Sequence, residues 1–418
     1  MTVRADYHPP LRYEGRTYAA HKEFVWGTHR AMPPEQTLAR IRPHLARAGI
    51  TRVGDITGLD TIGVPVAVAV RPASATLSVE SGKGLTLAAA LTSAAMEGIE
   101  RFVAEIDPIV DERGTVCEVA GRLPAPADRF PLFRHASISP HRTYDWTQMQ
   151  DLRTDQPFLV PAGLVHLPID REGIPFAFPW AASSNGLASG NHFSEAVCAG
   201  LYEVVERDAA WCWQTALGRG APPLVVDRST IDGPAISQLL GTLDDAGVDA
   251  RIVWCPTDVG VPTCLAFVID RRPGIGTYKG YGCHLDPEIA MIRAVTEAVQ
   301  SRTVFVAGAR DDMLRPVYEA NMRSGDLLAK LESPIGGRPV FETDIPNRAT
   351  SSFHGDVAVM LERLERAGFE HVLVRELEAS AFECSVVRVL VPGLETYQFQ
   401  WVAAGQRARN FDPSVVVG

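Results

Sequence analysis

The sequence predicts a mixed α/β (α+β) fold, organised as a single large domain. Short apolar runs bounded by glycine or proline predict strands, as in "TIGVPVAVAVRP" and "VPTCLAFVID". Longer segments with apolar residues at helical spacing separate them, for example "PPEQTLARIRPHLARAGI". Strands that alternate with helices are typical of α/β and α+β folds. A chain of 418 residues is also long enough to bury a large core.

The first half of the chain predicts two helices, a buried strand and a proline-rich stretch. Pro33 and Pro34 open the first helix, because proline is favoured in the first helical turn. The strand "TIGVPVAVAVRP" follows, and "SGKGLTLAAALTSAAMEGIERFVAE" predicts a glycine turn and a long helix. Residues 107–180 are rich in proline and contain short strand-like pieces such as "PFLVPAGLVHL".

The second half repeats the pattern of a loop that leads into a helix. "ASSNGLASGN" predicts a loop before the helix in "GNHFSEAVCAGLYEVVERDAAW", and "GYGCHLDPEIAMIRAVTEAVQSR" predicts a second loop and helix. Between them, "DARIVWCP" and "VPTCLAFVID" predict paired strands. A helix near 355–368 and strands in "HVLVREL" and "CSVVRVLVPG" complete the chain.

Composition argues against several classes of protein. The formal net charge is -10 and no basic stripe is visible, so we expect no nucleic-acid partner. The seven cysteines are scattered and contain no C-x-x-C pair, which fits a reducing cytosol better than a disulfide framework or a zinc site. The first residues lack the apolar core of a signal peptide, and no apolar run reaches membrane-spanning length. We therefore expect a cytoplasmic protein without membrane contact.

Three of the predicted helices carry carboxylates in largely apolar surroundings. In the helix after Gly84, Glu97 and Glu100 are three residues apart and so share a face. The last of the three carries Arg293 and Glu297 as an i,i+4 pair. Each helix follows a glycine-containing segment, which gives the chain a weak repeat.

The middle helix has the largest number of aligned carboxylates. At 100° per residue, Glu195 and Glu206 differ by about 20°, and Glu203 lies about 60° from Glu206. The three glutamates therefore form one broad stripe, and Arg207 and Asp208 follow at its end.

These carboxylates predict a divalent cation. An isolated E-x-x-E is more often a solvated face or a surface salt bridge, but helices that are apolar around most of their circumference are normally buried. Buried carboxylates need cations or hydrogen bonds, and Arg101, Arg207 and Arg293 are too few to balance them. Mg²⁺ is usually bound by a carboxylate or two together with substrate phosphates. We therefore expect a Mg²⁺–nucleotide site where the three helices converge.

The glycine segments add a possible phosphate site. "SGKGLT" is not a Walker A motif, which needs G-x-x-x-x-G-K-[ST], and taken alone it predicts only a turn. At a helix N-terminus, however, its backbone N–H groups and Lys83 can receive a phosphate. "SSNGLASGN" offers Asn185, Ser189 and Asn191 as polar contacts, although Asn191 fits a helix cap or turn residue equally well.

Together these segments resemble the YcaO family. "SGKGLTLAAALTSAAMEGIER", "NGLASGNHFSEAVCAGLYEVVERDA" and "GYGCHLDPEIAMIRAVTEAVQSR" match its three sequence blocks in order and with suitable spacing. The resemblance covers roughly residues 60–405 and implies a YcaO-type fold that binds ATP and Mg²⁺ without a Walker motif. It divides the chain into an N-terminal region, 1–59, that contributes to the nucleotide site, a catalytic domain, 60–405, and a tail, 406–418, without a Pro-rich motif.

The resemblance also implies roles for individual residues in a nucleotide cleft formed by the three acidic helices and their preceding loops. The implied Mg²⁺ and phosphate ligands are Glu97, Glu100, Glu195, Glu203, Glu206 and Glu297. The residues implied to line the nucleotide pocket or contact phosphate are Arg30, Thr37, Ser81, Lys83, Asn191, Arg207 and Arg293. Of these, Glu203, Glu206, Arg207 and Arg293 are the implied catalytic residues.

The implied chemistry is activation of a peptide backbone amide. A nucleophile adds to the carbonyl, the resulting oxyanion takes the γ-phosphoryl group of ATP, and loss of phosphate leaves a C=N or C=S product. No catalytic cysteine is required, and Cys283 of "GCH" fits a small buried residue better than a nucleophile.

Residues outside the three blocks suggest which product is formed. The segments "RAMPPEQT", "GITRVGDITGLDTIGVPV" and "VPGLETY" resemble the TfuA-associated subgroup, and the chain ends without the Pro-rich tail of many azoline-forming members. We therefore expect a thioamide-forming enzyme that uses an external sulfur donor, acts on a ribosomally made peptide or protein, works with a TfuA-like partner and forms a homodimer. The alternatives are an azoline-forming cyclodehydratase, an amidine-forming enzyme and a non-catalytic nucleotide-binding scaffold.

Overall fold

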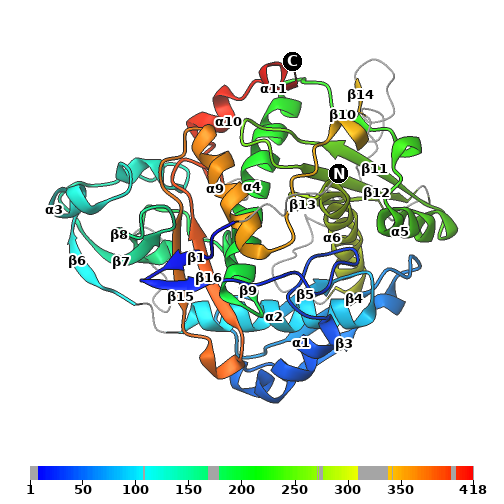
Figure 1. Cartoon of the computed structure of the whole chain (residues 1–418), viewed down its shortest axis with the longest axis horizontal. Helices are drawn as coiled ribbons and strands as arrows, with labels where there is room; N and C mark the ends of the chain where they lie inside the picture. The colour runs from blue at the N-terminus through cyan, green and yellow to red at the C-terminus, as the bar shows by residue number, and fades with distance from the viewer. Residues whose placement is uncertain are drawn as a thin grey trace. The chain divides into compact units, whose positions relative to one another are not determined.

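The computed structural model describes residues 8–106, 109–167, 178–270, 272, 276–308, 338–340, 342–396 and 402–417. The chain divides into two compact units, whose elements are labelled in Figure 1. Unit 1 comprises Met1–Lys22, Glu100–Cys212 and Thr350–Phe411, and unit 2 comprises Glu23–Ile99, Trp213–Ala349 and Asp412–Gly418. Two of the boundaries between the units, after Ile99 and after Cys212, fall within the acidic helices α2 (Leu87–Glu105) and α4 (Phe193–Gly218). The expected mixture of helices and strands is confirmed.

Unit 1 is built on an antiparallel sheet, which has six strands in the part of the chain described. The strand order is β6-β7-β15-β16-β9, and β8 pairs with β7. The bounds are β6 (Glu112–Thr115), β7 (Thr143–Asp151), β8 (Pro157–Pro161), β9 (Leu187–Gly190), β15 (Leu373–Leu377) and β16 (Ser385–Leu390). A separate hairpin joins β1 (Leu11–Tyr13) to β2 (Arg16–Tyr18).

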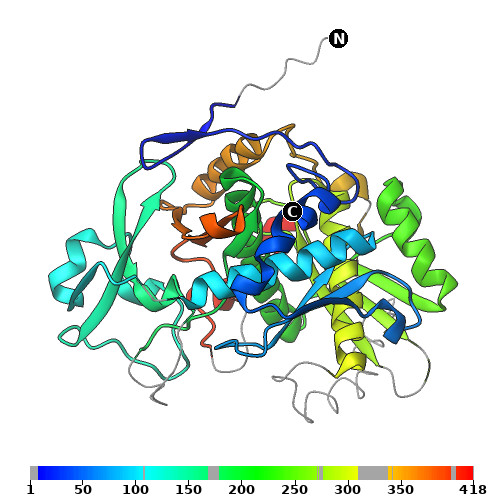
Figure 2. The ribbon, with the colours of Figure 1, turned by 90° about the horizontal axis from the view of Figure 1, so that it is seen from below.

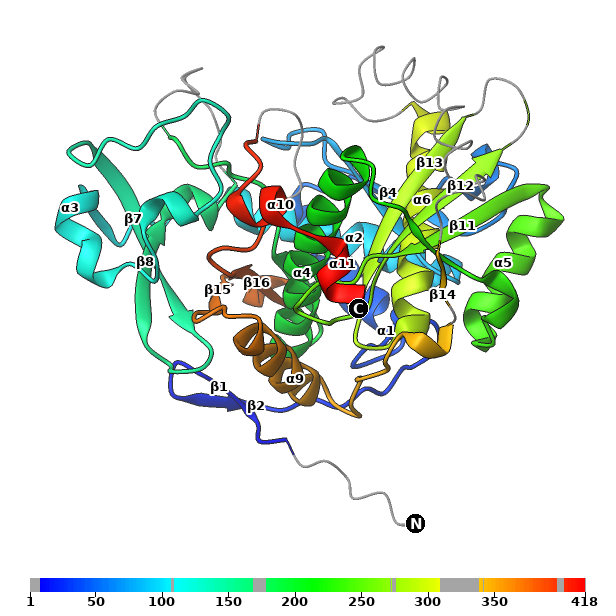
Figure 3. The same ribbon diagram turned by 90° about the horizontal axis from the view of Figure 1, so that it is seen from above.

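The α-helices described in unit 1 are α3 (Val116–Val119), α9 (Phe353–Arg366), α10 (Gln406–Asn410), the last part of α2 and the first part of α4. Gly200 of α4 packs against β16, since a Cβ on it would lie 2.6 Å from Cγ2 of Val389. Helix α9 lies beside α4 (Figure 3), where the hydroxyl of Tyr202 donates to Oδ2 of Asp356 at 2.8 Å. The same carboxylate binds Nζ of Lys22 at 2.7 Å, which anchors the N-terminal segment. These contacts fix the N-terminal part of α4 on the sheet.

Unit 2 contains a larger and a smaller sheet. In the larger one the described strands follow the order β13-β12-β11-β10-β14, antiparallel except for the β10–β14 pair. The bounds are β10 (Leu224–Val226), β11 (Val248–Trp254), β12 (Thr263–Asp270), β13 (Thr277–Cys283) and β14 (Arg338–Val340). The predicted pairing of "DARIVWCP" with "VPTCLAFVID" is confirmed in β11 and β12. Helix α6 (Pro287–Ala307) packs along β13 and β12, and α5 (Pro234–Asp245) contacts β11 (Figure 3).

The smaller sheet of unit 2 is the antiparallel set β3 (Arg52–Asp55), β4 (Val66–Val70) and β5 (Val79–Lys83). Figure 2 shows it in blue, together with α1 (Pro34–Ile41) and the start of α2. The hydroxyl of Thr92 in α2 donates to the carbonyl of Pro34 at 2.9 Å, which ties these two helices together.

The first helix is shorter than its periodicity predicts. The α-helix ends at Ile41, and a 3₁₀ turn, Arg42–Ala48, replaces the expected continuation. Pro43 explains the change, because proline has no N–H to donate to the carbonyl four residues earlier. The unit ends in α11 (Pro413–Val417). Within the described residues, no helix is both long enough and apolar enough to cross a bilayer.

Candidate functional site

Each acidic helix directly follows a strand that contains glycine. Gly82 lies in β5, Gly190 in β9 and Gly282 in β13, which lead into α2, α4 and α6. A Cβ on Gly82 would lie 2.3 Å from the carbonyl oxygen of Ala90, and one on Gly282 would lie 2.1 Å from that of Ala290. The missing side chains therefore let the strand touch the backbone of the helix that follows it.

This geometry corrects the prediction that the acidic helices follow glycine loops. Ser81 and Lys83 belong to β5, and Ser189 belongs to β9, so their side chains are placed by sheet pairing. Only short connections, such as Gly84–Thr86, separate strand from helix. From the sequence these glycines predict turns, whereas in the structure they permit close packing of strand on helix.

The carboxylates of α4 are largely withdrawn from water, as expected. Glu195 is 2% exposed and Glu206 is 1% exposed, while Glu203 is partly exposed. The side chain of Arg207 approaches both Glu203 and Glu206, with N–O distances of 3.9 and 4.0 Å. These separations are too long for hydrogen bonds. The guanidinium of Arg207 therefore offsets part of the negative charge of Glu203 and Glu206.

The residues just before α4 orient two further carboxylates of unit 1. Asn191 donates to Oε2 of Glu195 from its backbone N, at 3.0 Å, and from Nδ2, at 3.2 Å. Ser189 donates from Oγ to Oε1 of Glu100, in the part of α2 that belongs to unit 1. Asn191 lies two residues before Phe193, the first residue of α4, and its backbone and side chain both donate to Glu195. In this unit the structure brings together the predicted residues Glu100, Glu195, Glu203, Glu206, Arg207 and Asn191 on neighbouring elements.

A second group of predicted residues meets in unit 2. Nζ of Lys83 lies 2.9 Å from Oε2 of Glu297 and 3.1 Å from Oε1 of Gln300. Gln300 also donates from Nε2 to Oγ of Ser81 at 2.9 Å, and the backbone N of Tyr281 donates to Glu297. Gln300 is not among the site residues predicted from the sequence. Its signal is its position three residues after Glu297, on the same face of α6.

The remaining predicted residues of unit 2 lie on neighbouring elements. Glu97 and Arg293 are half-buried on α2 and α6. Arg30 lies in the segment before α1, where its backbone N donates to the carbonyl of Phe24 at 2.9 Å. Thr37 is 3% exposed within α1, and its hydroxyl lies 3.5 Å from the carbonyl of Pro33. A role for Arg30 and Thr37 at the nucleotide stays a prediction.

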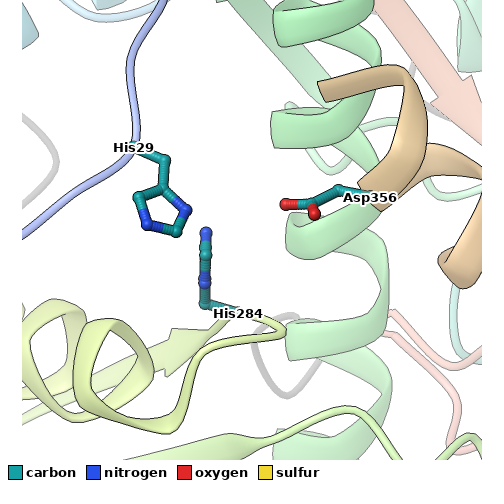
Figure 4. Close-up of side chains that lie close together, drawn as sticks. All are labelled: His29, His284 and Asp356. Atoms are coloured by element: carbon teal, nitrogen blue, oxygen red, sulfur yellow. The ribbon is translucent and has the colours of Figure 1, made fainter. Parts of the chain in front are cut away.

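The "GCH" segment does not present a reactive thiol. Cys283 is fully buried at the end of β13. His284 is 5% exposed, and its ring meets that of His29 edge-on at 4.9 Å (Figure 4). The backbone N of Asp286 donates to Nδ1 of His284 at 2.9 Å, so the proton of the neutral ring is on Nε2. His284 thus offers a hydrogen-bond donor towards His29.

The donor chemistry fits Mg²⁺ and a triphosphate. Carboxylate oxygens are the hard ligands that Mg²⁺ prefers, and unit 1 contributes Glu195 and Glu206 with almost no exposure to water. Lys83, Arg207 and Arg293 are cations suited to phosphate oxygens. Within each unit the carboxylates and cations lie on the strand–helix pairs described above.

Comparisons with known proteins define the family to which this chain belongs. Residues 81–395 match the model of the family described as "YcaO cyclodehydratase", binding ATP and Mg²⁺. The chain belongs to the YcaO family.

Two relatives match over nearly their whole length. One is an uncharacterized protein in the tfuA 3' region of Rhizobium leguminosarum bv. trifolii, 36% identical over 390 residues, which are 91% of this chain and 92% of the relative. The other is an uncharacterized protein of Methanothermobacter thermautotrophicus, 36% identical over 91% of this chain and 98% of its own length.

Solved structures share the fold. YcaO from Methanopyrus kandleri, bound with AMPPCP and Mg²⁺, has a TM-score of 0.69 and 26% identity, over 90% of this chain and 95% of that one. A heterocyclase in complex with substrate and cofactor has a TM-score of 0.73, over 93% of this chain and 55% of that one. At 23% identity, the second likeness shows the fold alone.

Proposed function

We propose that this protein is an ATP- and Mg²⁺-dependent enzyme that activates a backbone amide of a peptide or protein substrate, most specifically to form a thioamide. The observation that carries the proposal is the pair of buried carboxylates on α4, Glu195 and Glu206, in a chain of the YcaO family. Two buried carboxylates on one helix gain from a nearby cation, and the Methanopyrus relative is described with AMPPCP and Mg²⁺.

The proposed Mg²⁺ ligands are drawn from the carboxylates of the three acidic helices, Glu97, Glu100, Glu195, Glu203, Glu206 and Glu297. Bound Mg²⁺ would neutralise phosphate oxygens during phosphoryl transfer. Asn191 and Ser189 hold Glu195 and Glu100 in fixed orientations, so these ligands need little reorganisation. Lys83, which is paired with Glu297 in this structure, would be available to a phosphate oxygen once that pair opens. Arg207 and Arg293 would contact the phosphates or brace the carboxylates.

The reaction balances with hydrosulfide as the sulfur donor. The sulfur adds to the amide carbonyl carbon, and the carbonyl oxygen accepts the γ-phosphoryl group of ATP. The C–O bond then breaks, phosphate leaves with that oxygen, and the products are a thioamide, ADP and phosphate. The role of this chain is to position the triphosphate and the amide in line and to exclude water, which requires no nucleophilic side chain.

The genetic setting of a relative favours the thioamide product. The Rhizobium relative, which aligns over almost the whole chain, is named for its position beside tfuA. We propose that a TfuA-like protein assists this chain by presenting the substrate or supplying sulfur. An azoline-forming cyclodehydratase is the second candidate, because the family carries that description.

The mass of the product peptide tests the proposal. The purified protein is incubated with ATP, Mg²⁺, sulfide, the TfuA-like protein and the precursor peptide encoded beside it. Replacement of oxygen by sulfur adds about 16 Da, whereas azoline formation removes about 18 Da as water. A peptide of unchanged mass, together with ATP binding, would support a non-catalytic scaffold instead.

Substitution of Glu206 tests the site. Glu206→Gln keeps the shape of the side chain but removes a buried charge, so we expect peptide-dependent phosphate release to fall on the order of 100-fold. The matched control is Glu362→Gln, since Glu362 is an exposed residue of α9 that pairs only with Arg366 in the described part of the chain. Equal activity of both variants would contradict the assigned role of Glu206.

A further inference from the structure

One buried arginine has no part in the site described so far. Arg388, in the middle of β16, is 1% exposed. Its Nε donates to the carbonyl of Val165 at 3.0 Å and its Nη1 donates to that of Asn185 at 2.8 Å. Nη2 is buried with no hydrogen-bond partner, and among the described residues no carboxylate lies within ion-pair distance of the guanidinium. The buried positive charge of Arg388 is thus in direct contact with two backbone carbonyl groups.

Such an arrangement is costly. A buried charge without a counter-charge destabilises a fold by several kcal/mol, and an apolar residue would fill the same place in the sheet without that cost. Burial accordingly lowers the pKa of Arg388 to about 10, with the charge of Glu203 acting in the opposite direction and that of Arg101 adding to the effect. The guanidinium remains charged at neutral pH, so its charge needs an account beyond packing.

In unit 1 the turn that contains Asn185 and Gly186 connects Arg388 to α4, the helix that carries the acidic stripe. The carbonyl of Asn185 accepts the hydrogen bond from Nη1 of Arg388, and Gly186 follows Asn185 in the chain. A Cβ on Gly186 would lie 2.9 Å from Cγ1 of Val204. Val204 is the neighbour of Glu203 in α4. The carbonyl that Arg388 holds is therefore part of the turn that packs against the helix bearing Glu203.

Arg388 also holds the start of the strand that orients two proposed Mg²⁺ ligands. It pairs with Leu187 across the β16–β9 ladder. Strand β9 leads from Asn185 to Ser189 and Asn191, the donors to Glu100 and Glu195.

We propose that Arg388 is a positioning residue of the nucleotide site. Its buried positive charge changes the ligand preference of the acidic cluster of α4, so that the cluster binds the anionic Mg²⁺–triphosphate in preference to a bare cation. The inference rests on the proposed function. Its physical basis is that a fixed positive charge, close enough to interact electrostatically with Glu203, repels a free Mg²⁺ ion and attracts the net negative charge of the nucleotide complex.

Two substitutions separate charge from geometry. Arg388→Gln removes the charge but keeps an amide that can donate to a backbone carbonyl, while Arg388→Lys keeps the charge but loses the planar fork. The matched control is Arg375→Met. Arg375 is the cross-strand partner of Arg388 in β15, but it forms an ion pair with Asp111 at 2.8 Å.

The experiment is isothermal titration calorimetry of two ligands. AMPPCP is titrated in saturating Mg²⁺, and Mg²⁺ is titrated alone. In Arg388→Gln we expect AMPPCP to bind about tenfold more weakly while Mg²⁺ binds as well as before or better. Arg388→Lys should stay within about threefold of the unmodified protein for AMPPCP, and Arg375→Met should leave both affinities unchanged.

The opposed change in the two affinities is the signature of a charge effect, since structural damage weakens both ligands together. Parallel loss of both, or unchanged AMPPCP affinity in Arg388→Gln, overturns the proposal. If Arg388→Gln fails to fold, folded Arg388→Lys decides the matter, because loss of AMPPCP binding in that variant contradicts a role for the charge. If the unmodified protein itself fails to bind AMPPCP with Mg²⁺, it is the proposed function that fails.

Discussion

At the scale of single residues, two arginines are equally buried but have opposite surroundings. Arg302 and Arg388 are each 1% exposed. Arg302 binds Asp60 at 2.8 and 2.9 Å and Asp270 at 2.8 Å, so its charge is fully matched. Arg388 binds only carbonyls in the described part of the chain. The first arrangement is a closed ion network that fastens α6 to β12, whereas the second leaves a net charge that can act on a ligand.

His166 gives a residue-scale prediction of pH dependence. It is 4% exposed, and its Nε2 accepts the backbone N–H of Ile109 at 3.2 Å. Burial, with the charges of Arg375 and Arg388, lowers its pKa to about 4. The folded protein therefore favours the neutral ring. The contribution of neutral His166 to the free energy of unfolding is fully present above the pKa of histidine in the unfolded chain, near 6.5, and is lost as the pH falls towards 4.

His166→Gln should reduce that loss of stability. We expect the free energy of unfolding to fall less between pH 6.5 and pH 4 in the variant than in the unmodified protein, by up to about 3 kcal/mol. Urea unfolding at several pH values in this window measures the slope, and exposed His141→Gln is the control. Equal slopes in His166→Gln and the unmodified protein would show that His166 does not titrate in this way.

At the scale of elements, the strand–helix pairs β5–α2, β9–α4 and β13–α6 share one packing feature. Glycine in the strand lets the backbone of the following helix approach closely, and small residues such as Ala90, Ala290 and Ala294 line the contact. The carboxylates then project from helices whose position is set by a backbone contact. This explains why the sequence carries glycine at points where no turn occurs.

Substitution of Gly282 tests this packing. In Gly282→Ala the new Cβ would lie 2.1 Å from the carbonyl oxygen of Ala290 and 2.5 Å from the N of Ala294, so α6 or β13 has to shift. We expect a loss of about 2 kcal/mol or more in the free energy of unfolding and weaker nucleotide binding. Gly241→Ala in α5 meets nothing within 4 Å and should stabilise the protein slightly, since alanine favours helix. Chemical denaturation compares the two, and a neutral Gly282→Ala would refute the packing argument.

Local patterns in the sequence were enough to predict the acidic helices, the β11–β12 pair and the burial of Glu195 and Glu206. Periodicity and composition within about 20 residues determine these features. They could not reveal that Gln300 bridges Lys83 and Ser81, because those contacts join residues more than 200 positions apart. The role of Arg388 was hidden for the same reason, since a lone arginine in an apolar strand carries no sign of its partners.

At the scale of the whole chain, the last residues of unit 1 are bound to the helix that carries the proposed ligands. Asp208, two residues after Glu206, is fully buried and accepts Nε of Arg407 at 2.8 Å. It also accepts the backbone N of Glu395 at 2.9 Å. The carboxylate of Glu395 in turn receives the backbone N–H groups of Gly405 and Ala408, at 2.9 Å each, which satisfies the start of α10. Part of the segment predicted as a tail is thus an integral element of unit 1.

Removal of Arg407 should therefore cost far more than its position near the end of the chain suggests. Arg407→Met leaves Asp208 buried without its counter-charge, and burial already raises the pKa of Asp208 to about 6. We expect the free energy of unfolding to fall by about 3 to 5 kcal/mol. The double variant Asp208→Asn with Arg407→Met should lose less than Arg407→Met alone, because the unmatched charge is gone. Arg409→Met, at an exposed position of the same helix, is the control.

Thermal unfolding of the unmodified protein, Arg407→Met, Arg409→Met and the double variant decides whether the C-terminal segment is an anchor or a loose tail. A loose tail predicts equal melting temperatures for Arg407→Met and Arg409→Met. An anchor predicts a lower melting temperature for Arg407→Met alone, with partial recovery in the double variant. Asp208 and Glu206 lie on the same turn of α4, so the anchor also predicts that Arg407→Met weakens AMPPCP binding in saturating Mg²⁺. Full AMPPCP affinity in that variant would show that α4 keeps its position without the C-terminal segment.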